Sequence, residues 1–138
     1  MAKPDIYHDV VKEALVKDGW TITHDPLIVA FGRHNLFVDL GAERILAAEK
    51  EGQQIAVEIK SFVGRSLVHD LELAIGQFGL YRTILKQREP DRILYLAIPL
   101  NAYDDIFNSR LGQAAIEDHN LRLIVFDPVK EVVRKWIN

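Results

Sequence analysis

The stretch Ile55-Ala56-Val57-Glu58-Ile59-Lys60-Ser61-Phe62 combines a strongly apolar strand pattern with two charged residues. In an extended strand, side chains alternate between two faces, so the three β-branched residues share one face while Glu58 and Lys60 share the other. The β-branched face favours a strand that is buried on that side. A carboxylate and an ammonium group on the opposite face are costly unless they are paired, hydrogen-bonded or bound to a metal.

Length and composition set the class of protein. A chain of 138 residues that is 49% hydrophobic and 27% charged is ordinary for a globular protein, and we expect one domain over 1–138. The absence of cysteine excludes disulfides, thiolate zinc sites and cysteine nucleophiles. No apolar run approaches the ~20 residues of a membrane span, and the first residues do not form a secretory signal, so we expect a cytoplasmic protein.

The net charge of -3 argues against a protein that coats DNA, which would usually be basic. It does not exclude a nucleic-acid enzyme, because acidic metal ligands lower the net charge and a local basic patch can still attract phosphates.

The spacing of apolar residues predicts alternating helices and strands. Helices are predicted over 4–19, 68–89 and 101–118. Strands are predicted over 20–24, 27–31, 36–41, 45–48, 55–60, 92–99 and 121–126, with a final strand favoured over a short helix in 131–137. A hairpin about Glu51-Gly52 is expected to place Ile45 and Ala47 on the face of Ala56 and Glu58. The order of elements predicts an α/β domain with a mixed central β-sheet flanked by helices.

A second acid, Asp39, lies in the apolar run 36–41, 19 residues before Glu58. Two acids brought together by adjacent strands suit Mg²⁺, which prefers carboxylate oxygens and keeps open positions for water and phosphate. A nearby lysine can orient the attacking water and offset charge on the phosphate. The set Asp39, Glu58 and Lys60 therefore predicts metal-assisted phosphodiester hydrolysis. The alternative is a buried ion pair that closes the edge of a sheet.

Asp39 followed by Glu58-x-Lys60 resembles the PD-(D/E)xK nuclease superfamily, which has the restriction-endonuclease-like fold. Gln77 and Tyr81 match the Gln-x-x-x-Tyr motif of its RecB-like branch, and their spacing puts both on one face of a helix. One departure from the superfamily pattern is that Val38, not proline, precedes the first acid.

The whole chain is similar to the XisH family, the fdxN-element excision controlling factors of nitrogen-fixing filamentous bacteria. The stretches that carry this similarity are Asp5 to Trp20, Val38 to Gly41, Ala47 to Lys50, Ile55 to Phe62, Gly76 to Tyr81, and Lys135 to Ile137. The resemblance implies a protein needed for programmed removal of a DNA element. It implies DNA, a site-specific recombinase and the second factor XisI as partners, and leaves a homo-oligomer open.

These resemblances assign roles to individual residues. Asp39, Glu58 and the Ile59 carbonyl would hold Mg²⁺ or Mn²⁺, and Lys60 would position or activate water. Gln77 and Tyr81 would support the phosphate, although Tyr81 is equally expected as a core aromatic.

Glu13, on the first helix, occupies the place of an additional metal-associated acid in the fold, the alternative being a solvated helix residue. The histidines show no metal-ligand spacing and receive no role: His8, His24, His34, His69 and His119. A set of basic residues is interpreted as a solvated helix face rather than a flank for phosphates: Arg65, Arg82, Lys86, Arg88 and Arg92. The alternative function is a non-catalytic DNA- or protein-binding accessory factor that keeps the nuclease fold.

Overall fold

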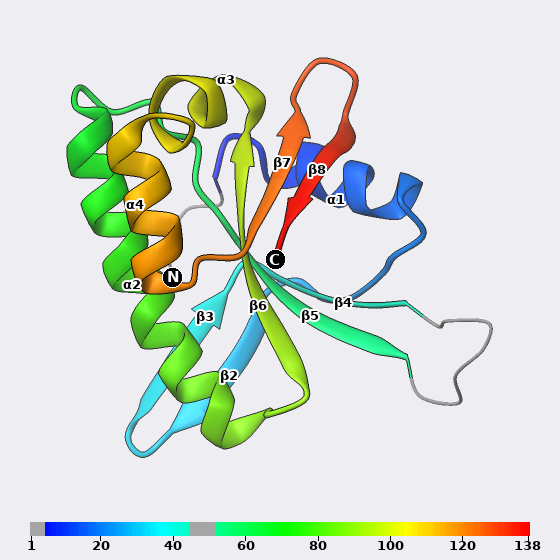
Figure 1. Cartoon of the computed structure of the whole chain (residues 1–138). Helices are drawn as coiled ribbons and strands as arrows, with labels where there is room; N and C mark the ends of the chain where they lie inside the picture. The colour runs from blue at the N-terminus through cyan, green and yellow to red at the C-terminus, as the bar shows by residue number, and fades with distance from the viewer. Residues whose placement is uncertain (1–4, 45–51) are drawn as a thin grey trace.

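The structure is a computed structural model that describes residues 5–44 and 52–138 (Figure 1). Its main sheet has six strands in the order β1-β4-β5-β6-β7-β8, and β2 and β3 form a separate two-stranded sheet. The strands are β1 (Thr21–His24), β2 (Leu27–Phe31), β3 (His34–Val38), β4 (Leu40–Arg44), β5 (Gln53–Ile59), β6 (Arg92–Pro99), β7 (Leu123–Asp127) and β8 (Val132–Ile137). The helices are α1 (His8–Lys17), α2 (Leu67–Arg88), α3 (Leu100–Ala102), the π-helical turn η1 (Tyr103–Phe107) and α4 (Arg110–His119).

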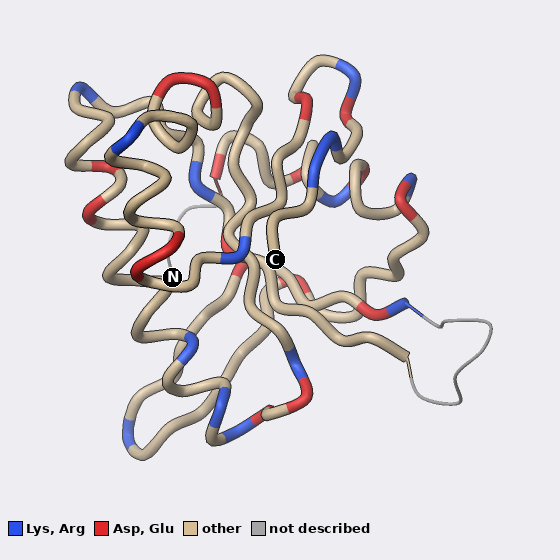
Figure 2. Tube along the Cα trace, in the orientation of Figure 1, with Lys and Arg blue, Asp and Glu red and all other residues tan. Residues whose placement is uncertain are grey.

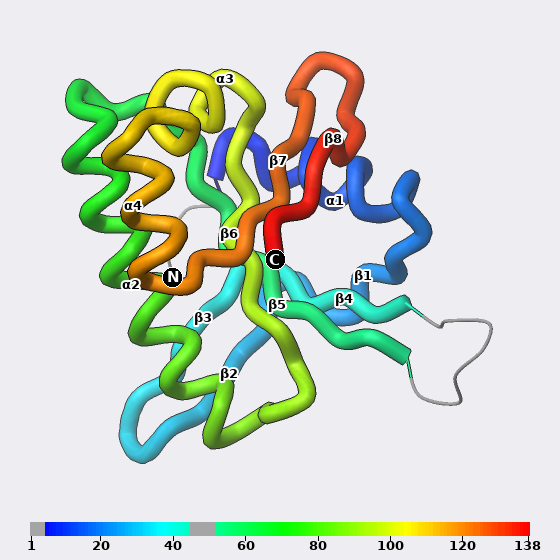
Figure 3. The backbone as a smooth tube through the Cα atoms, in the orientation of Figure 1, coloured from blue at the N-terminus to red at the C-terminus, as the bar shows by residue number. Residues whose placement is uncertain are grey.

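The main sheet is mixed, and helices cover both of its faces. β5, β6 and β7 are parallel, whereas β1, β4 and β8 run antiparallel to their neighbours. Helix α2 lies on one face with α4 beside it, and α1 lies on the other face next to the C-terminal strand β8 (Figures 1 and 3). The predicted α/β class with a mixed, helix-flanked sheet is therefore confirmed.

The two faces of β5 follow the predicted alternation. Ile55, Val57 and Ile59 pack in one apolar cluster with residues of α1. Ala56 packs in a second cluster with residues of α2. Glu58 is 5% exposed, so this charged position on the central strand is inside the protein.

The run 36–41, predicted as one strand, is two strands of different sheets. β3 ends at Val38, β4 begins at Leu40, and Asp39 forms the bend between them. The β2–β3 hairpin turns at Gly32, which has a φ of 61°, and buries Leu27 and Val29 in the cluster that contains α2 residues. The chain must then leave this hairpin to enter the main sheet, and the bend at Asp39 makes that change.

The predicted hairpin register is corrected by the observed pairing. β5 pairs with β4, so that Leu40 opposes Val57 and Ala42 opposes Ile55. The predicted strand 45–48, with Ile45 and Ala47, lies outside the described residues. The partner strand of β5 consists of the last two residues of the run 36–41, Leu40 and Gly41, followed by residues 42–44.

The predicted helix 101–118 is interrupted at Asn108 and Ser109. The Ser109 hydroxyl accepts a hydrogen bond from the Gly112 N–H and caps a new helix, α4. This restart changes the helical phase, and Leu111 is exposed on α4. On α2, Leu73 and Leu80 are likewise exposed, whereas Ile84 is buried.

The end of the chain forms a strand, β8, as favoured by its β-branched residues. No helix in the described parts of the chain is long and apolar enough to cross a membrane.

Candidate functional site

A cavity of about 560 Å³ opens where β5 ends, and it collects residues from five separate parts of the chain. It is lined by Asp5, His8, Asp25, Pro26, Asn35, Leu36, Phe37, Val38, Asp39, Glu58, Ile59, Lys60, Gln77 and Tyr81. Five of the predicted site side chains are among them: Asp39, Glu58, Lys60, Gln77 and Tyr81. The ends of parallel strands are a common place for ligand sites in α/β sheets.

The two acids are joined through backbone and side-chain hydrogen bonds. The Asp39 carboxylate Oδ2 accepts from the Ile59 N–H at 2.7 Å, and the Asp39 N–H donates to Glu58 Oε1 at 3.3 Å. The bend between β3 and β4 thus holds Asp39 against the last residues of β5. Both carboxyl groups face one cavity because of this geometry.

Glu58 has a strongly perturbed carboxyl group. Burial raises the pKa of Glu58 to about 9, the Asp39 charge and hydrogen bond add to the rise, and the Lys60 ammonium opposes it. Without a further positive charge, Glu58 is therefore protonated at neutral pH. A cation bound next to this carboxyl would favour its ionised form, and its binding would then release a proton.

Lys60 follows β5 directly and shares the cavity with both acids. Its N–H donates to the Ala97 carbonyl at 3.0 Å, which extends the pairing of β5 with β6 by one residue. Two residues later, Phe62 has a φ of 55°, a conformation rare for a bulky side chain. Phe62 is buried with its ring edge-on to Phe107 at 5.2 Å, and this packing holds the turn that ends the strand.

Gln77 and Tyr81 lie one turn apart on α2 and are hydrogen-bonded, with Gln77 Nε2 donating to the Tyr81 hydroxyl at 2.9 Å. Burial raises the pKa of Tyr81, the Gln77 bond opposes the rise, and the Glu58 and Asp39 charges add to it. The hydroxyl is therefore near both acids and stays neutral. Because its oxygen accepts from Gln77, its own proton is free to donate into the cavity.

The donor set fits a divalent cation of the Mg²⁺ type. In the part of the chain that the structure describes, no cluster of three or more histidine or acidic side chains is arranged to hold a metal. The cavity instead offers two adjacent carboxylates, and Ile59 with its main-chain carbonyl lines it as well. Mg²⁺ is commonly held by one or two carboxylates, with water completing its shell.

Glu13 is exposed on α1 and does not line this cavity. The buried residues of that helix are Val11, Ala14 and Leu15, which turns Glu13 outward. The structure therefore does not bring the predicted additional acid to the site.

Sequence reasoning missed a second polar group at the rim. His8 Nε2 and Asp25 Oδ1 are 2.6 Å apart, and Lys12 Nζ lies 2.7 Å from Asp25 Oδ2. Partial burial alone would raise the pKa of Asp25, but hydrogen bonds from Lys12 and His8 lower it. His8 and Asp25 are 17 residues apart, so no local spacing marks them as neighbours.

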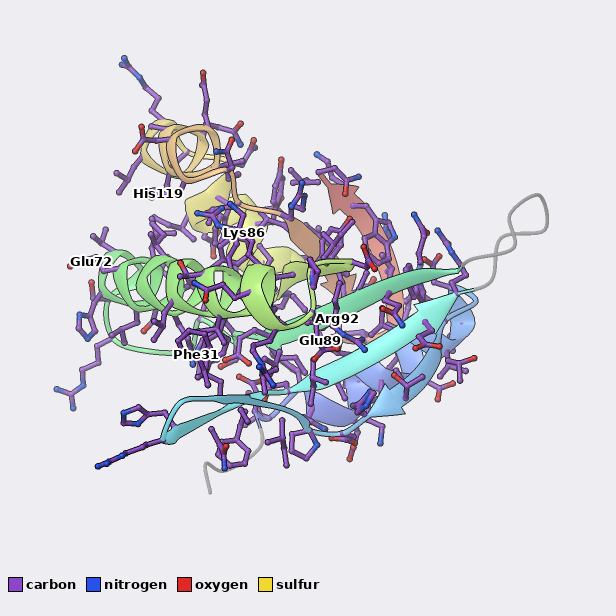
Figure 4. All side chains as sticks on the ribbon, turned by 90° about the horizontal axis from the view of Figure 1, so that it is seen from below. Phe31, Glu72, Lys86, Glu89, Arg92 and His119 are labelled. Carbon is purple, nitrogen blue, oxygen red and sulfur yellow. The ribbon has the colours of Figure 1, made fainter. Side chains whose placement is uncertain are left out.

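The basic residues around α2 do not form one flank. Arg92 is buried beside Glu89, with Nε and Oε1 3.0 Å apart, and also donates to the Ile55 carbonyl (Figure 4). Arg82 donates to the His119 carbonyl next to α4. Lysine and arginine positions are scattered along the chain and alternate with acidic ones (Figure 2).

Fold and site together define an α/β protein with a two-carboxylate and lysine cavity at the end of its central strand. The family model described as XisH protein matches residues 1–134. This chain therefore belongs to the XisH family.

Two solved structures are similar over nearly the whole chain. An XisH family protein from Nostoc punctiforme PCC 73102 is 42% identical, with a TM-score of 0.88, and the match covers 97% of this chain and 100% of that one. An fdxN element excision controlling factor protein from Anabaena variabilis is 43% identical, with a TM-score of 0.86 and coverage of 97% and 99%. Comparison with curated proteins finds no match.

Proposed function

We propose that this chain is an XisH-like excision controlling factor, needed for site-specific excision of a DNA element, whose cavity is a metal-dependent DNA endonuclease site. In this proposal residues 1–138 form a single restriction-endonuclease-like domain of the PD-(D/E)xK superfamily. The observation that carries the proposal is the joined pair Asp39 and Glu58 with Lys60 in one open cavity. The description of the similar Anabaena variabilis protein as an fdxN element excision controlling factor supports the excision part.

Each residue has a role that follows from its position. A Mg²⁺ or Mn²⁺ ion would be held by Asp39, Glu58 and the Ile59 carbonyl, and it would supply a polarised phosphoryl oxygen and a water of lowered pKa. The Lys60 ammonium offsets charge on the phosphate and orients the water. The Tyr81 hydroxyl, held by Gln77, donates to a phosphate oxygen. Glu58 releases its proton when a cation enters, because its metal-free pKa is about 9.

A second function is favoured by a separate observation. Leu73 and Leu80 lie about two turns apart on the same side of α2 and are 56% and 57% exposed, and an exposed apolar face of a helix can serve as a binding surface. An accessory factor that binds DNA, the recombinase machinery or XisI through such a surface would need no catalysis. In that case Glu58 remains a neutral, buried carboxyl that stabilises the bend at Asp39.

The test is cleavage of plasmid and linear DNA in Mg²⁺ or Mn²⁺ by wild type, Glu58→Gln and Glu72→Gln. Glu72 is exposed on α2 and does not line the cavity, so it provides a matched substitution. Metal-dependent cleavage by wild type and Glu72→Gln, but not by Glu58→Gln, supports the nuclease.

The assay is repeated with the recombinase and XisI present, after pull-down shows which of them bind. If wild type does not cleave in any of these mixtures, or if Glu58→Gln cleaves equally well, the catalytic proposal is wrong. Binding of a partner without cleavage then favours the accessory role.

A further inference from the structure

A second cavity of about 560 Å³ lies at the other end of the central strands and shares no lining residue with the first. Its walls come from the end of β4, the beginnings of β5 and β6, the residue before β7, the end of β8 with the residue that follows it, and the segment after α1. It is lined by Asp18, Trp20, Arg44, Gln53, Ile55, Ile93, Tyr95, Arg122, Trp136 and Asn138. The proposed nuclease chemistry uses none of these residues.

Aromatic rings form one wall of this cavity. Trp20 and Trp136 pack with ring centres 5.6 Å apart, and Tyr95 meets Trp136 edge-on at 5.0 Å. The Arg44 guanidinium lies 4.6 Å from the centre of the Trp20 ring. Ile93 is 36% exposed at the same opening. A ligand here would meet flat apolar surfaces next to a cation.

The side-chain acceptors that line the cavity already receive hydrogen bonds from lining donors, and the Tyr95 hydroxyl donates to Asn138 Oδ1. The Trp136 indole donates to Asp18 at 3.2 Å, and Arg44 Nη2 donates to Gln53 at 2.9 Å. Trp20 Nε1 and Arg44 Nε are buried and have no partner among the described residues. Buried donors without protein partners are uncommon, so these two N–H groups favour a ligand that accepts hydrogen bonds. The Arg44 side chain covers the Trp20 ring. If this side chain turned toward a ligand, acceptor atoms of the ligand would be within reach of both Arg44 Nε and Trp20 Nε1.

The charges of the lining residues also favour an anion. Arg44 and Arg122 line the cavity, neither forms an ion pair within the described ranges, and the one lining acid, Asp18, already accepts from Trp136. Burial raises the pKa of Tyr95, and the Arg122 and Arg44 charges oppose that rise. Both guanidinium groups therefore act on the same buried hydroxyl. Guanidinium groups match phosphate oxygens well in geometry and charge.

We propose that this second cavity binds a nucleoside monophosphate, with Arg44 and Arg122 on the phosphate and Trp136 and Ile93 against the nucleoside. The volume is in the range that holds a ligand of this size. The same chemistry is presented by a free nucleotide and by a 5′-phosphorylated DNA end. The proposal does not depend on nuclease activity at Asp39 and Glu58.

The chain contains two tryptophans, and both line this cavity, so its intrinsic fluorescence reports on binding directly. Adenosine 5′-monophosphate, adenosine and a 5′-phosphorylated oligonucleotide are titrated, with excitation at the red edge of the indole band. The proteins are wild type, Arg122→Gln and, as a matched control, Arg110→Gln. Arg122 and Arg110 are both exposed, so neither substitution is expected to disturb folding.

A phosphate-bearing probe should change the fluorescence of wild type and Arg110→Gln saturably, with binding at least about tenfold weaker in Arg122→Gln. A response to the mononucleotide identifies a free nucleotide as the ligand of this cavity, whereas a response to the oligonucleotide alone identifies a DNA end as the ligand. Glu58→Gln should bind like wild type even if nuclease activity is absent. The proposal is overturned if neither phosphate-bearing probe gives a saturable change, if Arg122→Gln binds like wild type, or if adenosine binds as tightly as its monophosphate.

Discussion

Replacing Glu58 by glutamine should stabilise the metal-free protein at alkaline pH, although it changes a residue of the central strand. Glutamine keeps nearly the same shape and can still accept the hydrogen bond from the Asp39 N–H. What it removes is a carboxyl group whose pKa burial raises from 4.5 to about 9. In the unfolded chain this group is ionised at neutral pH, whereas in the folded protein it keeps its proton.

The size and sign of the effect follow from that difference. Below about pH 4.5 the Glu58 carboxyl is protonated in both the folded and the unfolded chain. Its full contribution to the free energy of unfolding is therefore present there. As the pH rises toward 9, folding must take up a proton, and the free energy of unfolding falls by up to about 1.4 kcal/mol per pH unit. Between pH 5 and pH 7 this amounts to a loss of up to about 3 kcal/mol. The glutamine in Glu58→Gln does not titrate, so the free energy of unfolding of this variant should not fall with pH in this way.

The assay is urea unfolding from pH 5 to pH 9 in the presence of a chelator. The free energy of unfolding of wild type and of the surface control Glu72→Gln should fall across this pH range. That of Glu58→Gln should stay nearly constant. Asp25 and Asp127, whose pKa values are lowered, affect stability only at more acidic pH. Adding Mn²⁺ at pH 8 should stabilise wild type and not Glu58→Gln. Parallel pH profiles for wild type and Glu58→Gln would refute the argument that Glu58 is a buried, proton-holding carboxyl.

Three further predictions concern other parts of the chain. Tyr81→Phe should change the free energy of unfolding by about 1 kcal/mol or less. Cleavage should fall about tenfold if the hydroxyl contacts phosphate, with Mn²⁺ stabilisation unchanged; an unaltered rate would count against that contact. Asp25→Asn should weaken the loss of stability below about pH 4 by less than about 1 kcal/mol, because the His8 and Lys12 partners are partly exposed, and a larger change in acid titration would contradict this. Gly76→Ala should stabilise α2 by about 1 kcal/mol, because its Cβ would meet open space. Gly112→Ala should destabilise by about 1–3 kcal/mol, because its Cβ would lie 2.1 Å from the Ile106 carbonyl oxygen. Equal urea midpoints for the two glycine variants would contradict this comparison.

The central strand and the long helix could be predicted because their patterns are strong. Alternation of period two fixed the faces of β5, and the apolar spacing of 68–89 matches α2 within one residue at each end. The grouping of Asp39 with Glu58 and Lys60 followed from chemistry, since charges on a buried strand need partners. The helix face of Gln77 and Tyr81 came from the family resemblance.

The break at Asp39 gave no comparable signal. The run 36–41 is apolar on both sides of the acid, so it has the pattern of one strand, and only the competing β2–β3 hairpin separates it into two. The break before α4 did have a signal, because Ser109 is a favourable helix N-cap and Gly112 follows at the position it binds. Because the predicted helix 101–118 rested on apolar spacing alone, it continued through this cap.

The rim pair could not be predicted from spacing. His8 begins α1 and Asp25 follows β1, and the packing of α1 against β1 brings them together. Glu13 shows the opposite case, because its place in the sequence suggested an additional acid while the buried stripe of α1 turns it to solvent. Contacts of this kind depend on tertiary packing that local patterns do not encode.

The most direct test of a divalent cation at Asp39 and Glu58 is anomalous diffraction from crystals soaked in Mn²⁺ at alkaline pH, with Glu58→Gln crystals treated in the same way. We expect an anomalous peak within coordination distance of both carboxylates in wild type, and its loss in Glu58→Gln. The absence of a peak at these carboxylates, or an equal peak in the variant, would contradict a metal site formed by Asp39 and Glu58.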